Sequence, residues 1–214
     1  MADNTNANSS GSGKTPAPPG AVASAEEVLA DPSVASRIVA LGKQLIGERA
    51  TDATRAARVL DQVIELNPAA CAPIVDRLVK GLSSPNKRVA ATSAAALPQI
   101  ARVAPARVAK HLDTLRALYP SLPPVGKDGL VRTFTALCLA SVAYQKRLES
   151  VLKLALREAD PKTLTDWAAA VLPALKGEPH ANARLVVERR LPDLDRAHGQ
   201  RLADLLGVRL RPKR

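Results

Sequence analysis

An internal repeat restricts the possible folds of this chain more than any other feature of its 214 residues. A leucine recurs at intervals of 37, 40 and 35 residues, at Leu60, Leu97, Leu137 and Leu172. The same offsets give three more apolar columns, which are Val75, Leu112, Leu152 and Val187, then Cys71, Val108, Leu148 and Ala183, then Val63, Ile100, Ala140 and Leu175. A period of this length is typical of folds that stack one supersecondary unit on the next. We therefore predict four repeated units.

The apolar spacing within each unit is that of a helix. Two stripes with three- and four-residue steps are Ala56, Val59, Leu60, Val63 and Ile64, and Leu130, Val131, Phe134, Leu137 and Cys138. A polar residue followed by proline, a typical helix start, occurs at Asp31-Pro32, Asn67-Pro68, Ser84-Pro85 and Asp160-Pro161. No stretch alternates like a strand, and aromatic residues make up only 2% of the chain. The sequence predicts an all-α fold whose core is built from Ala, Leu and Val.

Each unit reads as a helix, a short turn and a second helix, as in ELNPAACAPIVDRLVKGL and ARVAPARVAKHLDTLRAL. This pattern resembles HEAT repeats over residues 50–191, with flanking helices expected at 31–47 and 191–208. The resemblance implies a right-handed α-solenoid of about four helix pairs; a generic helical bundle is the alternative. A fifth column, Leu78, Leu115 and Ala155, ends at Arg190, as expected if the last unit turns one face to water. We expect a disordered tail at 1–30, the helical-repeat domain at 31–208 and a basic tail at 209–214.

Three apparent chemical motifs have simpler interpretations. GSGKT at 11–15 resembles a phosphate-binding loop, but the motif requires a glycine where Asn8 stands and a strand before it. Cys71 and Cys138 lie in apolar columns or stripes and are expected to be core residues. His111 replaces an aliphatic residue, which predicts a partly buried ring hydrogen-bonded to a neighbour, or else a ligand contact or a pH-sensitive joint.

Asp166-Trp167 allows a comparison with the HEAT-like alkylpurine DNA glycosylases, which this chain resembles in being basic and helical. That resemblance implies a groove where aromatic residues and a carboxylate hold a damaged nucleotide. Trp167, however, shares a helical stripe with Leu164 and Val171, and the chain has four aromatic residues in all. We therefore expect a core tryptophan, no aromatic-lined pocket, no catalytic residues, no cofactor and no metal, and we interpret the protein as non-enzymatic.

The net charge is +11. The HEAT resemblance implies that the second helix of each pair lines a concave surface. Basic residues of these helices are our candidate binding residues: Arg77, Lys80, Arg107, Lys110, Lys146, Lys153, Arg157, Arg184 and Arg189. A second candidate is the basic tail of Arg209, Arg211, Lys213 and Arg214.

Two functions remain open at this point, with an enzyme of unfamiliar type as a distant third. The first is a scaffold that binds a macromolecular partner, an acidic protein or peptide. The second is a sequence-nonspecific nucleic-acid binder that contacts duplex phosphates, because scarce aromatics disfavour base stacking. No small-molecule substrate is evident. Without a secretory signal or an apolar run that could cross a bilayer, we expect a cytoplasmic protein.

Overall fold

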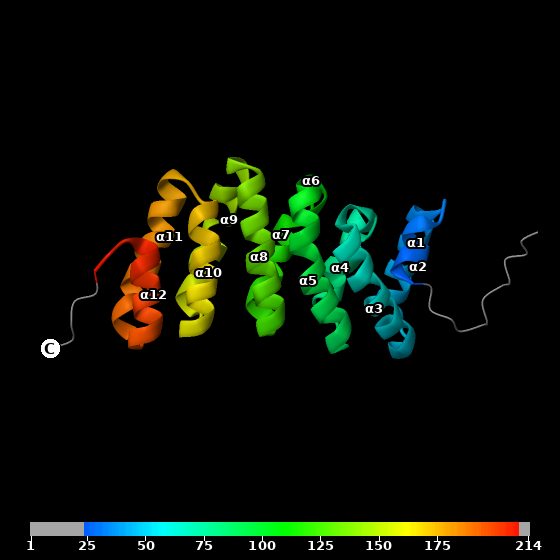
Figure 1. The fold of residues 1–214 in the computed structure, drawn as a ribbon, viewed down its shortest axis with the longest axis horizontal. Coiled ribbons are helices and arrows are strands. Elements are labelled where there is room, and N and C mark those ends of the chain that lie inside the picture. The colour runs from blue at the N-terminus through cyan, green and yellow to red at the C-terminus, as the bar shows by residue number, and fades with distance from the viewer. Residues whose placement is uncertain (1–23, 210–214) are drawn as a thin grey trace, which may run out of the picture.

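The computed structural model describes residues 24–209, and all regular structure among them is helical (Figure 1). The α-helices are α1 (Ala25–Ala30), α2 (Val34–Leu45), α3 (Ala50–Leu66), α4 (Val75–Gly81), α5 (Lys87–Val103), α6 (Pro105–Ala109), α7 (Leu112–Leu118), α8 (Pro124–Ala140), α9 (Val142–Glu158), α10 (Pro161–Ala174), α11 (Gly177–Arg190) and α12 (Arg196–Leu206). The 3-10 helices are η1 (Pro68–Ile74), η2 (Tyr119–Ser121) and η3 (Leu191–Asp193). The predicted all-α fold is confirmed.

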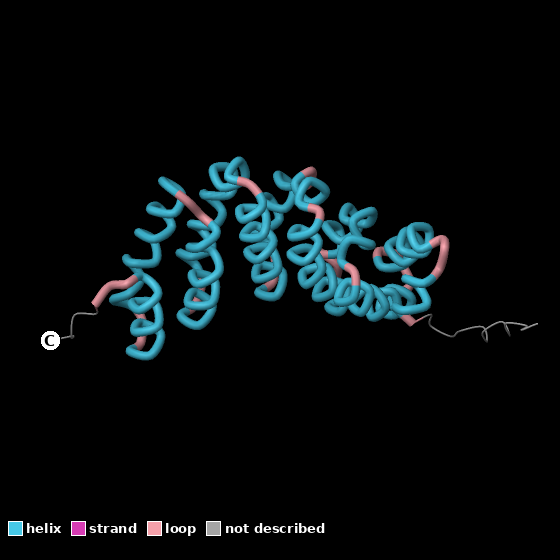
Figure 2. Tube along the Cα trace, turned by 45° about the horizontal axis from the view of Figure 1, so that its top comes forward, coloured by secondary structure: helices cyan, strands magenta, loops and turns pink. Residues whose placement is uncertain are grey.

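The helices follow one another along the long axis of the molecule in chain order, from α1 at one end to α12 at the other (Figure 1). Figure 2 shows that this row bends into a shallow arch. Within the row, α3, α5, α8, α10 and α12 pack successively against each other, and we call them the first layer. The helices that follow each of them, namely η1 with α4, α6 with α7, α9 and α11, form the second layer.

The first four helices of the first layer begin at even intervals. Ala50, Lys87, Pro124 and Pro161 are each 37 residues after the one before. One non-helical residue joins the first helix to the second in the first three pairs. These residues, Asn67, Ala104 and Ser141, are again 37 apart, with φ of −151°, −139° and −160°. The structurally equivalent column is therefore Leu60, Leu97, Phe134 and Val171, all with no exposed surface.

The predicted 40-residue step is thus wrong for the first layer, where Ala140 is exposed although its column required a buried residue. It fits the buried side chains of the second layer, including Leu112 and Leu152. The second-layer helices of the first two pairs are interrupted at Ile74 and His111, whose φ and ψ of −108° and 15°, and −102° and 11°, are nearly the same. Helix α9 has no such interruption. Both steps reach buried side chains of it, since Gln145 and Leu152 lie 37 residues after Val108 and Leu115, and Leu148 lies 40 residues after Val108.

Of the four predicted helix starts, Asp160-Pro161 is confirmed as an α-helix start. Asp160 caps α10 by accepting a hydrogen bond from the backbone N–H of Thr163 at 3.0 Å. Pro68 opens a 3-10 helix instead of an α-helix. The other two helices begin later than predicted. Asn86, two residues after Ser84, caps α5, and α2 begins at Val34 instead of Pro32.

Helical order begins before the predicted boundary at Asp31. The side chain of Ser24 caps α1 together with Glu27, and Ala25 and Val28 are buried against the rest of the fold. Asp31 ends this helix rather than starting the next one. The GSGKT motif, the rest of the predicted disordered tail and the basic residues Arg211, Lys213 and Arg214 lie outside the described residues.

The core is aliphatic, as the composition predicts, and both predicted stripes are buried along their whole length. Cys71 and Cys138 are buried free thiols within it. Burial raises the pKa of each thiol from 9.0 to about 12, which keeps both protonated at neutral pH. Nothing in α1 to α12 is long and apolar enough to span a membrane.

Candidate functional site

Six of the nine candidate cations in the second layer are free to bind a partner. Their side chains have no ion pair or hydrogen bond to any residue of the described range 24–209. All six are exposed. Five belong to α4, α6, α9 and α11, and the sixth, Lys110, lies in the turn before α7. The six are Lys80, Arg107, Lys110, Lys146, Arg157 and Arg189. We call them the second-layer cations. Arg209, from the predicted tail, is exposed as well.

The other three candidates are engaged within the fold. The ammonium of Lys153 donates to Oε1 of Glu149 at 3.1 Å, and that carboxylate also accepts from Asn182 of α11 at 2.8 Å, so these bonds hold the pKa of Glu149 below its usual value. Arg184 donates to Glu188 at 2.7 Å and to the carbonyl of Leu206 at 2.8 Å. Arg77 lies 3.9 Å from Asp76 and is only 20% exposed. Lys153, through Glu149, and Arg184 thus take part in contacts between helices, and Arg77 is only partly exposed, so these three residues are poor contacts for a partner.

Arg190 does not present a polar face to water, as its place in the repeat suggested. Its guanidinium donates to the backbone carbonyls of Leu156, Arg157 and Ala159 at the end of α9. The last carbonyls of a helix have no partner inside the helix, so an arginine from the next pair satisfies them. Arg190 interrupts the apolar column because its side chain forms these hydrogen bonds from α11 to the end of α9.

Gln145, a buried residue of α9 that is 37 residues after Val108, was not predicted to have a structural role. Its amide donates to the carbonyls of Cys138 at 3.2 Å and Ala174 at 3.0 Å, and its oxygen accepts from the N–H of Lys176 at 2.9 Å. One side chain thus satisfies backbone groups at the ends of α8 and α10. A 37-residue alignment would have flagged it as a polar residue in the column of Cys71 and Val108.

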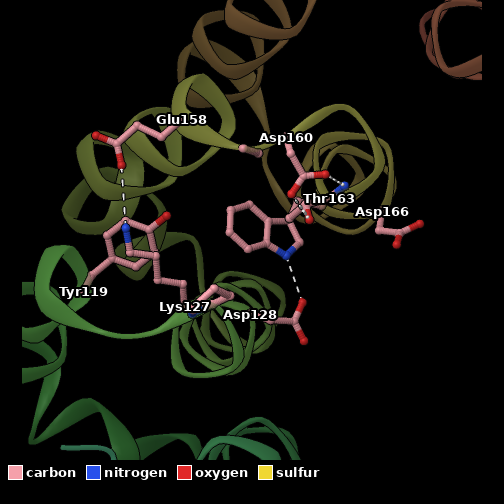
Figure 3. Close-up of a pocket in the computed structure, with 10 residues that line it drawn as sticks. Tyr119, Lys127, Asp128, Glu158, Asp160, Thr163 and Asp166 are labelled. Carbon is pink, nitrogen blue, oxygen red and sulfur yellow. Dashed lines mark hydrogen bonds and ion pairs between the residues drawn. The ribbon is translucent and has the colours of Figure 1, made fainter. Parts of the chain in front are cut away.

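A cavity of about 270 Å³ lies where η2, α8, the end of α9 and the start of α10 meet (Figure 3). Trp167 lines it and donates from its indole Nε1 to Asp128 Oδ1 at 2.8 Å. Its walls are Tyr119, Pro124, Lys127, Asp128, Glu158, Ala159, Asp160, Thr163, Asp166 and Trp167. Trp167 is 5% exposed, as expected of a core residue, but the expectation that no aromatic-lined pocket exists is wrong, since two of the four aromatic residues meet here.

The cavity is acidic in a basic protein. Four carboxylates and one ammonium line it, a net formal charge of −3. The ammonium of Lys127 lies 5.3 Å from the centre of the Tyr119 ring and 4.0 Å from Glu158. Burial, with a smaller contribution from Glu158, raises the pKa of Tyr119 to about 12. Hydrogen bonds from Thr163 hold the pKa of Asp160 below its usual value, so this carboxylate stays ionised.

A second, more open cavity of about 620 Å³ lies between α3 and α5. Charges of both signs line it, and Arg88 forms an ion pair with Asp61 across it. Thr92 borders it with a buried hydroxyl that has no hydrogen-bond partner among residues 24–209. This mixture points to no particular ligand.

His111 is half-buried at the start of α7. None of the residues that the structure describes hydrogen-bonds its ring, so the predicted hydrogen bond to a neighbour is wrong. Within the same residues no three His, Cys, Asp or Glu side chains are grouped as metal ligands would be.

Comparison with known proteins gives no match: no family model, no curated protein and no solved structure is similar to this chain.

Proposed function

We propose that this chain is a right-handed α-solenoid of about four HEAT-like helix pairs and acts as a non-enzymatic scaffold. The 37-residue spacing of α3, α5, α8 and α10 supports a repeat array. So does the packing, in which each first-layer helix contacts the next along the row. In a bundle, by contrast, the helices share one central core. Helices α1, α2 and α12 flank the four pairs.

The partner in this proposal is an acidic segment of another protein, bound by the second-layer cations. The proposal depends on one observation: six exposed Lys and Arg side chains of one layer form no hydrogen bond or ion pair within residues 24–209, and only Lys146 has a longer-range attraction to a carboxylate, that of Glu149. Such unpaired charges attract an anionic partner and speed its association. On α9, Lys146 and Arg157 are eleven residues apart, close to three helical turns, so both project from the same face.

A direct binding comparison tests the partner class. The full chain is titrated with a peptide rich in Asp and Glu and, separately, with a short DNA duplex, each at ~50 and ~200 mM salt. The proposal predicts tighter binding of the peptide at both salt concentrations. Tighter binding of the duplex, with a log–log salt slope of roughly −0.9 per phosphate contact, would establish the nucleic-acid alternative instead.

A further inference from the structure

The acidic cavity between α8 and α10 has a charge opposite to that of the second-layer cations and is unexplained by them. We propose that it binds a cationic side chain, the guanidinium of an arginine presented by a partner protein. This inference does not depend on the proposed function, because the two sites share no residue.

The walls of the cavity combine aromatic rings with carboxylates. Tyr119 and Glu158 already hold one ammonium, that of Lys127, through a cation–π contact and an ion pair (Figure 3). The same close-up shows Asp160, Thr163 and Asp166 on the opposite side, carried by the start of α10. An aromatic wall facing carboxylates is the environment that stabilises an organic cation.

The carboxylates of the cavity outnumber the cations that neutralise them. Asp128 is neutralised by Arg132, whose Nε donates to it at 2.8 Å, and Glu158 is partly neutralised by Lys127. Asp166 forms no hydrogen bond or ion pair with any residue of the described chain, but its charge interacts with that of Arg132, which Asp128 also binds. The hydrogen bonds to Asp160 come from Thr163 and from neighbouring backbone, and none comes from a cation. The four carboxylates at this cavity therefore share two cations, and within residues 24–209 Asp160 has no cationic partner.

The arrangement of the carboxylates favours an organic cation over a metal ion. The carboxylates line the cavity without converging as three metal ligands would. A guanidinium is planar, presents five donors and can bond to a carboxylate while it stacks on an aromatic ring. Arginine fits dispersed acceptors beside Tyr119 and Trp167 better than a metal ion, which needs its ligands around one point.

The experiment uses the single tryptophan of the chain as a reporter. Trp167 fluorescence and its indole N–H resonance are followed while the full chain is titrated with an N-acetyl-arginine amide. The neutral citrulline analogue serves as the matched ligand. We expect a saturable change with arginine and none with citrulline.

Variants with opposite expected effects complete the test. Glu158→Gln with Asp160→Asn removes two charges, and asparagine still caps α10, so we expect binding about tenfold weaker. Lys127→Met removes the internal competitor and should strengthen binding. Glu48→Gln with Glu65→Gln, both exposed residues outside the cavity, is the charge-matched control and should leave the affinity unchanged. Equal binding of citrulline, no saturable response, or an equal effect of both double variants would overturn the proposal.

Discussion

Gln145 is the residue whose role depends most on its position in the fold. It lies at a position that is apolar in the first two pairs, yet all three of its hydrogen bonds are to backbone groups at helix ends. Those groups would otherwise be buried without partners, because the end carbonyls of α8 and α10 have none within their own helices.

Replacing this amide should therefore be costly even though the new side chain is apolar. We expect Gln145→Leu to lower the free energy of unfolding by about 2–3 kcal/mol, because buried carbonyls lose their donors. Urea denaturation measures the change. Gln44→Leu, at an exposed position, is the control and should stay within about 0.5 kcal/mol. A similar small effect at both positions would show that the hydrogen bonds of Gln145 to the helix ends do not stabilise the fold.

The two buried thiols give a prediction on pH. Their pKa of about 12 in the fold exceeds the value of 9.0 for a free thiol, so the native state holds these protons more tightly. This difference contributes stability below pH 9, and the contribution is lost as the pH rises from 9 towards 12.

At pH 8, the same shift should make native Cys71 and Cys138 about a thousandfold poorer in thiolate than unfolded thiols. We expect a thiol reagent to label the native chain only as fast as it unfolds. Full labelling of two thiols in denaturant is the control. Rapid labelling of either cysteine without denaturant would contradict the burial described here.

Among the elements, α5 and α8 pack against each other at backbone distance. A Cβ added at Gly129 would lie 2.5 Å from the carbonyl oxygen and 2.7 Å from the Cβ of Ala94. Both obstacles belong to the backbone or to a side chain that cannot rotate away. The two helices approach so closely because each contributes a residue with almost no side chain.

Gly129→Ala should separate these helices and destabilise the fold by about 2 kcal/mol, as overpacking does. Helix propensity alone predicts the opposite sign, a gain of about 1 kcal/mol. Thermal unfolding distinguishes the two. Gly126→Ala is the control, since its new Cβ would lie 3.1 Å from the Cβ of Leu122, a milder overlap than the 2.5 Å at Gly129, and its loss should be smaller. A more stable Gly129→Ala variant would contradict the close contact.

The buried faces of the helices were predictable from sequence. The alignment of the third repeat and the contacts between helix ends were not. The stripes from Ala56 to Ile64 and from Leu130 to Cys138 are buried because three- and four-residue spacing fixes one face of a helix. The register predicted for α8 was wrong because one 40-residue step was applied to both helices of the third pair. That step reaches buried residues of α9 but places exposed Ala140 in an apolar column of α8.

For the whole molecule, the sequence predicted which layer carries cations but could not tell which of them are free. Lys153, Arg184 and Arg190 resemble Lys146 and Arg157 in sequence. In the fold, however, Lys153 donates to Glu149 of its own helix, and Arg184 and Arg190 donate to backbone carbonyls beyond theirs. The acidic cavity was missed because Tyr119, Asp128 and Trp167 come from separate elements. Only folding brings them together.

The central claim is that the second layer, and not net charge alone, binds an acidic partner. Its test compares two variants that each change six exposed cations to glutamate and shift the net charge from +11 by −12 to −1. One changes the second-layer cations. The matched variant changes six exposed cations of the first layer, Arg55, Lys87, Arg102, Lys162, Arg196 and Arg201.

Both proteins are titrated with the acidic peptide after circular dichroism confirms equal helix content. We expect the second-layer variant to lose affinity by at least about a hundredfold and the first-layer variant by less than about tenfold, because only the former loses direct contacts. Equal losses in the two variants would show that binding follows net charge, and would contradict a binding surface on the second layer.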